Sequence, residues 1–401
     1  MADLFERYVP NKTTDFFSKM SKLVYLVGFP NFWVEDLKFS KSFVKFYNWV
    51  SSFINVFLYI FVCLEIGSFF TQHDLTEKQY ADRLVFGFSQ PILCLYRVIM
   101  TYHQDLVTEL LLKLSVELKE VYNDPEIEKK MIRKAKFCSV AFLSLCAQSL
   151  VFYGYDAMMR SLQTGVPFST VITAWPEIQD QSDAASVMRI AGYFAWWMLM
   201  SRVFGAYLLV VSIVVCLEYQ YKNLQSYFNN LNNIFENEKW SKHQRELKYV
   251  ESLRVGIKLH SETLWCTRQA QATCSTVFEG QTLLNICVLV LLMLQMMNSD
   301  RSLESVFAIV TTSVATLIST GFFMWTAGDV TVEASHLPMA MYCSGWHNCE
   351  QSAVAIRKLL VIAMMQAQKP VAISGFGMVL FSYQAYLSIV KTSYSVFSVL
   401  Y

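Results

Sequence analysis

Charged residues are scarce in this chain of 401 residues. Asp, Glu, Lys and Arg make up 16% of the sequence and hydrophobic residues make up 54%, whereas soluble domains carry about 25% charged residues. The net charge is +1, and so small a charge argues against a nucleic-acid partner. The composition therefore excludes an ordinary soluble domain and makes the lipid bilayer the first environment to consider.

Motifs of catalysis and of metal binding are also missing. The chain has no glycine-rich phosphate loop and no nucleophile elbow. Cys343, His347 and Cys349 lack the paired spacing of a structural zinc site. The loops assigned below to the outside of the cell contain none of the ten cysteines, so we expect no extracellular disulfides. We predict neither an enzyme nor a bound metal or other cofactor.

The sequence contains long apolar runs that are nearly free of charged residues. Stretches of about 20 nearly uncharged residues, enough to cross roughly 30 Å of hydrocarbon as helix, recur seven times. They cover residues 49–70, 84–102, 137–155, 190–217, 274–297, 306–327, and 370 to about the C-terminus. The sequence therefore predicts an all-α membrane protein with seven transmembrane helices.

The segments between the runs have a helical pattern of their own. Residues 101–136 and 218–272 mix charged and apolar residues at helical spacing, so we expect helices that continue beyond the membrane. An apolar run at 353–369 is too short to span and is stopped by Pro370, which predicts a cytoplasmic helix. The chain then divides into a cytoplasmic N-terminal segment (1–48), transmembrane helices 1 to 6 with cytoplasmic extensions (49–327), a cytoplasmic helical region (328–369) and a seventh helix (370–401).

Lysine and arginine lie mostly on one side of the predicted spans. Segments on the side of the N-terminus contain 25 of them, and segments on the other side contain 6. Basic segments stay in the cytoplasm, so we expect a cytoplasmic N-terminus and, after seven crossings, an extracellular C-terminus. The sequon at Asn11 should then remain unglycosylated. This orientation is opposite to that of a G-protein-coupled receptor.

The last helix carries a polar stripe. Five polar residues follow one another at spacings of 4, 3, 4 and 3, which places them on one helix face: Gln384, Ser388, Lys391, Ser395 and Ser398. A helix from Pro370 to the end would be about 48 Å long, so Lys391 would lie inside the membrane. A lysine there has to face protein or water. The stripe indicates either a water-filled pore or a contact between packed helices.

The C-terminal region resembles the insect odorant receptor family. The matching positions are Trp346, Arg357, Lys358, Leu359, Gln368, Lys369, Pro370, Gly375, Lys391, Ser393, Tyr394, Ser395, Phe397 and Leu400. The motif covers about the last 60 residues, and the predicted topology extends the resemblance to the whole chain. The sister gustatory receptors end in a Gln-Phe pattern that this sequence lacks.

The resemblance implies an odorant-gated, non-selective cation channel in the plasma membrane of olfactory sensory neurons. In this family the channel is a tetramer, the last helix lines the pore, and cytoplasmic helices form an anchor. The chain looks like a ligand-tuned subunit that assembles with a shared co-receptor, because its second cytoplasmic loop lacks the co-receptor's long insertion. The family's apolar constriction would fall at Phe397 and Tyr401, roughly a quarter turn from the polar stripe, and Tyr394 flanks both faces. The constriction candidates are therefore Tyr394, Phe397 and Tyr401, with Ser395 and Ser398 as wet neighbours, and either face could line the pore.

The resemblance also implies a pocket for a small hydrophobic volatile in the outer half of the membrane, among helices 2, 3, 4 and 6. The corresponding residues are mostly aromatic: Phe86, Phe88, Phe152, Tyr153, Tyr193, Trp196, Trp197, Met200, Phe307 and Thr311. Such walls bind by shape and dispersion. For each single residue, contact with lipid or plain packing is the competing interpretation.

Other functions are weighed against the channel. A metabotropic seven-helix chemoreceptor would signal through a G protein, and a gustatory receptor-like channel would share the topology. A secondary transporter would show inverted repeats, and the sequence has none.

Overall fold

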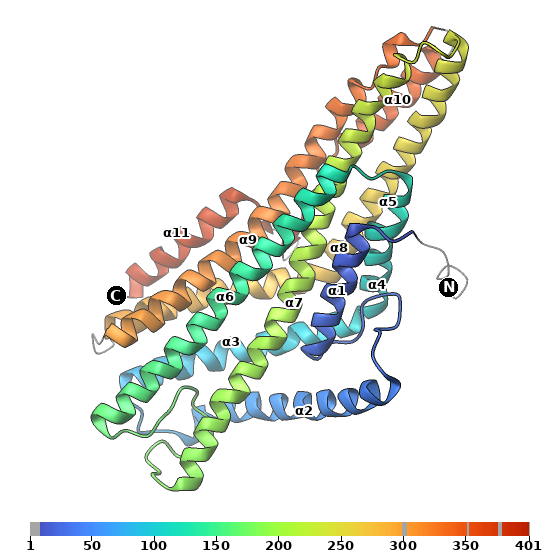
Figure 1. The fold of residues 1–401 in the computed structure, drawn as a ribbon. Helices are drawn as coiled ribbons and strands as arrows, with labels where there is room; N and C mark the ends of the chain where they lie inside the picture. The colour runs from blue at the N-terminus through green and yellow to red at the C-terminus, as the bar shows by residue number, and fades with distance from the viewer. Residues whose placement is uncertain (1–8, 299–302, 351–352, 376–378, 401) are drawn as a thin grey trace.

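The computed structural model describes residues 9–298, 303–350, 353–375 and 379–400, and it is almost entirely helical (Figure 1). In chain order its elements are α1 (Lys12–Leu26), α2 (Lys41–Thr71), α3 (Glu77–Tyr102), α4 (Gln104–Leu112), the π-helical turn η2 (Lys113–Glu117), α5 (Leu118–Val121), α6 (Pro125–Thr164), α7 (Asp183–Asn230), the 3₁₀ turn η3 (Leu231–Ile234), α8 (Lys242–Asn298), α9 (Leu303–Tyr342), the 3₁₀ turn η4 (Trp346–Asn348), α10 (Ala353–Ala367), the strands β1 (Ser374–Gly375) and β2 (Val379–Leu380), and α11 (Tyr383–Leu400). The predicted all-α class is confirmed.

Six of the described helices are long and apolar enough to cross a membrane: α2, α3, α6, α7, α8 and α9. Each contains one of the first six predicted runs. Large apolar side chains on α2 face outward, with Trp49 68% and Phe70 77% exposed, as lipid contact requires. The count of seven crossings and the orientation of the termini stay predictions.

Four helices extend far beyond their apolar spans. The long helices α7, α8 and α9 run side by side to the end of the molecule where α10 lies, remote from α2, and α6 joins them along part of the way (Figure 1). The helices expected within 101–136 and 218–272 are present. The helix expected within 353–369 is present as α10, which ends before Pro370 and packs on α9.

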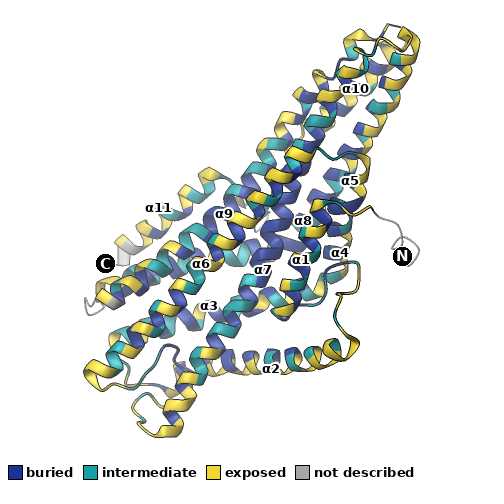
Figure 2. Cartoon of the chain, in the orientation of Figure 1, coloured by how far each residue is buried: buried dark blue, intermediate teal, exposed yellow. Residues whose placement is uncertain are grey.

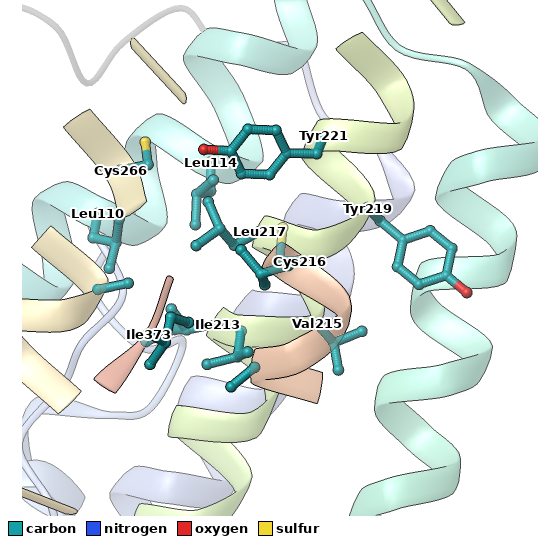
Figure 3. Close-up of a cluster of buried hydrophobic side chains, with 14 of the residues drawn as sticks. Leu110, Leu114, Ile213, Val215, Cys216, Leu217, Tyr219, Tyr221, Cys266 and Ile373 are labelled. Atoms are coloured by element: carbon teal, nitrogen blue, oxygen red, sulfur yellow. The ribbon is translucent and has the colours of Figure 1, made fainter. Parts of the chain in front are cut away.

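The core of the molecule is the middle of α7. Residues 205–221 of this helix are buried on every side, beneath α6, α8 and α9 (Figure 2). Their sequence has no polar face, as expected for a helix enclosed by others. Figure 3 shows side chains of this region, including Ile213 and Tyr221, packed against Leu110, Leu114 and Cys266 from the neighbouring helices.

The start of the last helix differs from the prediction. The helix does not begin at Pro370: Ser374–Gly375 and Val379–Leu380 pair as the short antiparallel strands β1 and β2, and α11 begins at Tyr383. The side-chain amide of Gln271 on α8 accepts from the amide N of Ser374 at 2.9 Å and donates to its carbonyl at 2.7 Å. Gly375 lies directly under the ring of Phe381. These contacts hold the segment extended, so α11 has 18 residues and a length of about 27 Å.

Candidate functional site

A partly open cavity of about 130 Å³ lies among α3, α6, α7, α8 and α9. Its volume is close to that of an engineered cavity of about 150 Å³ that binds benzene. The apolar part of its wall includes Phe86, Leu150, Trp196 and Val288, each less than 9% exposed. By its volume, a small ring-sized molecule is the ligand that the space fits.

Three aromatic rings pack together at this wall, and two of them, Phe86 and Trp196, line the cavity. The rings of Phe86 and Trp196 meet edge to face with centroids 4.7 Å apart. Tyr153 makes the same kind of contact with Phe86 at 5.7 Å and with Trp196 at 5.6 Å. Edge-to-face pairs add stabilisation beyond the area they bury, so the three rings from α3, α6 and α7 form a rigid group beside the cavity.

Another part of the lining is polar. Gln90 on α3 is 0% exposed, and neither atom of its side-chain amide has a hydrogen-bond partner. Asn285 on α8 is 1% exposed; its Oδ1 accepts from Gln281 at 3.1 Å, but its Nδ2 is without a partner. Buried polar groups in proteins are normally paired. The cavity therefore has unused amide groups on two helices.

A charged cluster lies at the N-terminal end of α3. Gln295 donates to Asp82 at 2.7 Å and accepts a long bond of 3.5 Å from Tyr153. Close by, Asp156 pairs with Lys78 and with Arg160. These contacts link α3, α6 and α8 above the aromatic group, so the cavity is separated from the loops by a layer of paired polar side chains.

The structure brings some of the predicted pocket residues together and leaves others apart. Phe86, Trp196 and Met200 line the cavity. Tyr153, Tyr193 and Trp197 pack in the same apolar cluster without lining it.

The other four predicted residues do not line the cavity: Phe88, Phe152, Phe307 and Thr311. Phe88 is 37% and Phe307 55% exposed, and the Phe152 ring stacks on Phe307 at 6.0 Å.

Sequence reasoning missed the polar half of the site. The missed residues are Ser89, Gln90, Ser149, Gln281, Asn285, Thr312, Thr316 and Ser319. Their spacing carried a signal, because Gln281 and Asn285 are four residues apart in an apolar run, as are Thr312 and Thr316. Polar residues one turn apart in a transmembrane helix share a face that avoids lipid.

The polar stripe of α11 is exposed along its whole length. Gln384, Ser388, Lys391, Ser395 and Ser398 all lie on the outer side of the helix. The inner side, with Ile389 and Ser393, is buried and packs on α8 and α9. The stripe therefore does not pack against other described helices of its own chain.

Of the predicted constriction residues, Tyr394 is 64% exposed, and Ser395 and Ser398 are exposed as well. The side chain of Phe397 and the whole of Tyr401 lie outside the described residues.

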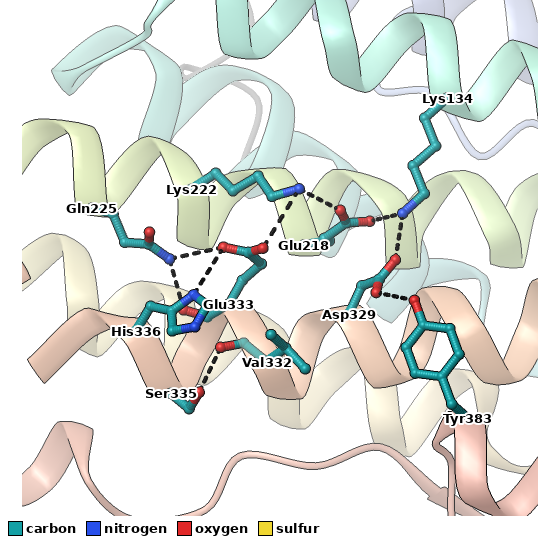
Figure 4. A network of polar contacts seen from close by, with 10 residues as sticks. All are labelled: Lys134, Glu218, Lys222, Gln225, Asp329, Val332, Glu333, Ser335, His336 and Tyr383. Carbon is teal, nitrogen blue, oxygen red and sulfur yellow. Dashed lines mark hydrogen bonds and ion pairs between the residues drawn. The ribbon is translucent and has the colours of Figure 1, made fainter. Parts of the chain in front are cut away.

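A polar network joins the base of α11 to three other helices (Figure 4). Lys134 on α6 bonds to the buried carboxylate of Glu218 on α7 at 2.5 Å and to Asp329 on α9 at 2.6 Å. The hydroxyl of Tyr383, at the start of α11, donates to Asp329 at 2.6 Å. Lys222 extends the network from Glu218. Any movement of the base of α11 therefore acts on this network.

No group of three or more His, Cys, Asp or Glu residues in the described part of the chain is placed to hold a metal ion.

The fold and the cavity define a helical membrane protein with a space for a small molecule between its helices. The family model of the 7tm odorant receptors matches residues 84–394, more than half of the sequence, and the chain belongs to this family. The resemblance read from the C-terminal motif is thereby confirmed. No curated protein sequence matches the chain.

Solved structures support the same fold. The insect olfactory receptor OR5 from Machilis hrabei has a TM-score of 0.79 at 14% identity, with 96% of this chain and 97% of that chain covered. The same receptor in complex with eugenol gives a TM-score of 0.80, also at 14% identity and with the same coverage.

Proposed function

We propose that this chain is a ligand-tuned subunit of an odorant-gated, non-selective cation channel in the plasma membrane of olfactory sensory neurons. The observation that carries the proposal is the exposed polar stripe of α11. An isolated polar stripe in a membrane-length bundle needs water or a polar partner, and a central pore between subunits supplies water.

The proposed orientation keeps the N-terminus in the cytoplasm and the C-terminus outside. Residues 1–48 are then cytoplasmic, residues 49–327 contain six spans with their extensions, and residues 328–369 contain the anchor. The pore-lining helix of this proposal is α11, from Tyr383 onward, in place of the longer helix from Pro370. The excess of lysine and arginine on one side supports this orientation.

The ligand site is the cavity between the aromatic group and the two amides. The eugenol complex of the related receptor supports a small volatile ligand. A ligand that offers a hydroxyl or carbonyl oxygen would pair with Gln90 or with Asn285, whereas a pure hydrocarbon would leave both amides unpaired, at a cost of about 1–3 kcal/mol. We therefore propose that the preferred odorants are small oxygenated molecules rather than hydrocarbons.

The gate is proposed at the outer end of α11, at Tyr394, Phe397 and Tyr401. A narrow apolar ring expels water and blocks ions, and a widening of a few ångströms readmits both. Binding opens the gate if the ligand prefers the open state, and a tenfold preference needs only about 1.4 kcal/mol. A small repacking around the cavity is enough for that.

The proposed partner is the co-receptor, in a tetramer. An apolar row on α10 supports assembly, because Val354, Val361, Ile362 and Met365 are each more than 50% exposed in a region outside the apolar spans. Such a row is normally covered by another protein surface.

The proposal is tested by expressing the chain with and without the co-receptor and recording excised patches in nucleotide-free solution. A panel of volatiles should evoke cation current only when both subunits are present. Current that strictly requires GTP would instead establish the metabotropic alternative. Epitope tags add an independent reading, since only a C-terminal tag should be stained on intact cells.

A further inference from the structure

An open groove of about 580 Å³ runs between α1 and α6 and reaches α7. It is separate from the odorant cavity and from the polar face of α11, since it shares no lining residue with either. Figure 1 shows α1 lying across the side of the bundle, close to α7. The groove is therefore a surface that the proposed channel function does not use.

The two helices that form the groove are held with their first turns together. The backbone N–H and the hydroxyl of Thr13, in the first turn of α1, both donate to Glu128 in the first turn of α6, each at 2.8 Å. Glu128 is 4% exposed, so this contact is a buried anchor. Both helices consequently run through the groove in the same direction.

Charge and apolar surface are separated along that direction. On α6 the lining begins with Lys129 and Lys136 and continues with Val140 and Leu143, a distance of about 21 Å along the helix. On α1 it begins with Lys12. The apolar end lies in the predicted span of α6, and the lysines lie just before that span.

The charged end is strongly cationic. Four lysines line the groove, and one carboxylate, Asp15, accompanies them, which leaves three positive charges in excess. Lys19 pairs with Asp15 at 2.7 Å. Lys129 lies 3.9 Å from Glu126, which does not line the groove. Within the described residues, Lys12 and Lys136 form no ion pair.

The apolar end has room for a chain. Leu23 is 55%, Val140 66% and Leu143 46% exposed, while Phe204 and Leu208 of α7 form the floor. An acyl chain would cover these side chains at a depth where lipid tails are present. The floor alone accepts the tail of any lipid, so the lysines decide which headgroup is bound.

We propose that this groove binds one anionic phospholipid of the cytoplasmic leaflet, with its headgroup among Lys12, Lys129 and Lys136 and an acyl chain along the α6–α7 floor. Basic pockets beside cytoplasmic helix ends bind anionic headgroups through charge-assisted hydrogen bonds. The assignment to the cytoplasmic leaflet rests on the proposed orientation. The binding itself does not, because it depends only on the groove.

The test uses the full-length chain in phosphatidylcholine vesicles that contain a small fraction of either spin-labelled phosphatidylserine or spin-labelled phosphatidylcholine. Electron paramagnetic resonance separates the lipid immobilised on the protein from the free lipid. We expect a preference for phosphatidylserine that falls on the order of tenfold in the triple variant Lys12→Gln, Lys129→Gln, Lys136→Gln. The labelled lipid is present in both leaflets, so the result is independent of the orientation and of channel activity.

The matched control removes three exposed lysines near the start of α2: Lys38→Gln, Lys41→Gln, Lys45→Gln. It should keep the preference, because the net charge changes equally but the groove is intact. A second variant, Val140→Trp, fills the groove at an exposed position without changing charge and should lower the immobilised fraction. The proposal would be overturned if the triple variant and the control lost the preference for phosphatidylserine equally. It would also be overturned if the unmodified protein showed no preference for phosphatidylserine.

Discussion

At the scale of single residues, the most informative side chains are the unpaired amides of the cavity. Gln90 can donate and accept, and the Nδ2 of Asn285 can only donate. Amides that pair with each other would make the cavity polar but closed to ligands. Here these amide groups are unpaired, and in the proposed site they would reject an analogue that lacks the matching group.

The first prediction concerns the selectivity that these amides produce. Gln90→Leu should lower the response to an alcohol or ketone by about tenfold or more and should spare, or improve, the response to a hydrocarbon of matching shape. The measurement is the concentration of each ligand that gives half-maximal current. Phe194→Leu, on an exposed residue of α7, is the control.

The outcome separates two questions. If no volatile opens the channel, the channel proposal itself fails. If volatiles open it and Gln90→Leu lowers both responses equally, the channel proposal survives, and the preference for oxygenated ligands is wrong.

A second residue prediction concerns the turn after α1. Gly28 has φ +93°, accepts a hydrogen bond from Arg97 at 3.0 Å, and lies against the guanidinium of Arg202 where a Cβ would stand. Gly28→Ala should therefore cost about 2 kcal/mol or more, from backbone strain together with displacement of a buried charge. Thermal unfolding of the purified protein measures the loss.

Gly165→Ala is the matched control for that turn. Gly165 has φ +69°, but no atom lies within 4 Å of a Cβ built there, so only the backbone strain of about 1–2 kcal/mol applies. Equal losses in the two variants would mean that Arg202 moves aside without cost.

The sequence predicted the aromatic part of the cavity better than its polar part. The helices and the depth of the pocket came from the family resemblance, and of the ten residues chosen there Phe86, Trp196 and Met200 line the cavity. Gln90 and Asn285 could not be assigned to it from the sequence, because a polar side chain in a span can face a neighbouring helix, a cavity or a pore. Which of these it faces depends on how five helices pack around it.

At the scale of elements, α11 is held by contacts at its base. The ring of Trp325 on α9 lies against Tyr383 and Tyr386. Gly328 allows a close approach of the two backbones, because a Cβ at this position would lie 3.3 Å from the Cα of Ser382. Next to Gly328, the carboxylate of Asp329 accepts a hydrogen bond from the hydroxyl of Tyr383. The proposed pore helix is therefore joined to α9 both by packing and by one charged hydrogen bond.

The third prediction is that this hydrogen bond sets the resting position of α11. Tyr383→Phe removes it but keeps the ring stacked on Trp325. A hydrogen bond to a charged group contributes about 1.5–3 kcal/mol, and less where it is exposed, so the equilibrium between open and closed states should shift by roughly tenfold. The expected sign is a higher open probability without ligand, measured in single-channel records.

Tyr386→Phe provides the comparison. Tyr386 lies one turn further along α11 and contacts the same Trp325, but its hydroxyl has no hydrogen-bond partner within the described residues. It should leave the open probability unchanged. If both variants behave alike, the packing of the rings holds α11, and the bond to Asp329 has no part in gating.

The boundary of α11 shows where prediction from the sequence stopped. The apolar character of residues 370–382 suggested helix, yet Ser374–Gly375 and Val379–Leu380 are strands. The side-chain amide of Gln271, about 100 residues earlier in the chain, pairs with Ser374 and stabilises the extended backbone there. The local sequence pattern cannot predict a contact between residues so far apart in the chain. By contrast, the first six spans were predictable, since about 20 apolar residues in a row leave few alternatives to a helix in a membrane.

At the scale of the whole molecule, the two unused surfaces lie on the last two helices. The apolar row on α10 and the polar stripe on α11 both face away from the rest of the chain, while the inner side of α10, with Ile356 and Leu360, is buried. Contact between copies or with the co-receptor would cover the apolar row on α10. The same assembly would place the polar stripe on α11 along a water-filled space between the subunits. The two surfaces together therefore favour assembly over a monomer.

The fourth prediction tests the α10 row. Ile362 is 66% exposed, so Ile362→Glu should fold normally as a single chain. In an interface it would bury an unpaired carboxylate at every repeat of the contact, and each costs several kcal/mol. Mass photometry of the chain purified together with the co-receptor should therefore show tetramers replaced by smaller species. Val121→Glu, at a residue of α5 that is 52% exposed, carries the same change away from α10 and should leave tetramers intact. Tetramers that persist in Ile362→Glu would place the assembly contacts elsewhere, and a pore bounded by α11 would then have to be held together by the membrane spans alone.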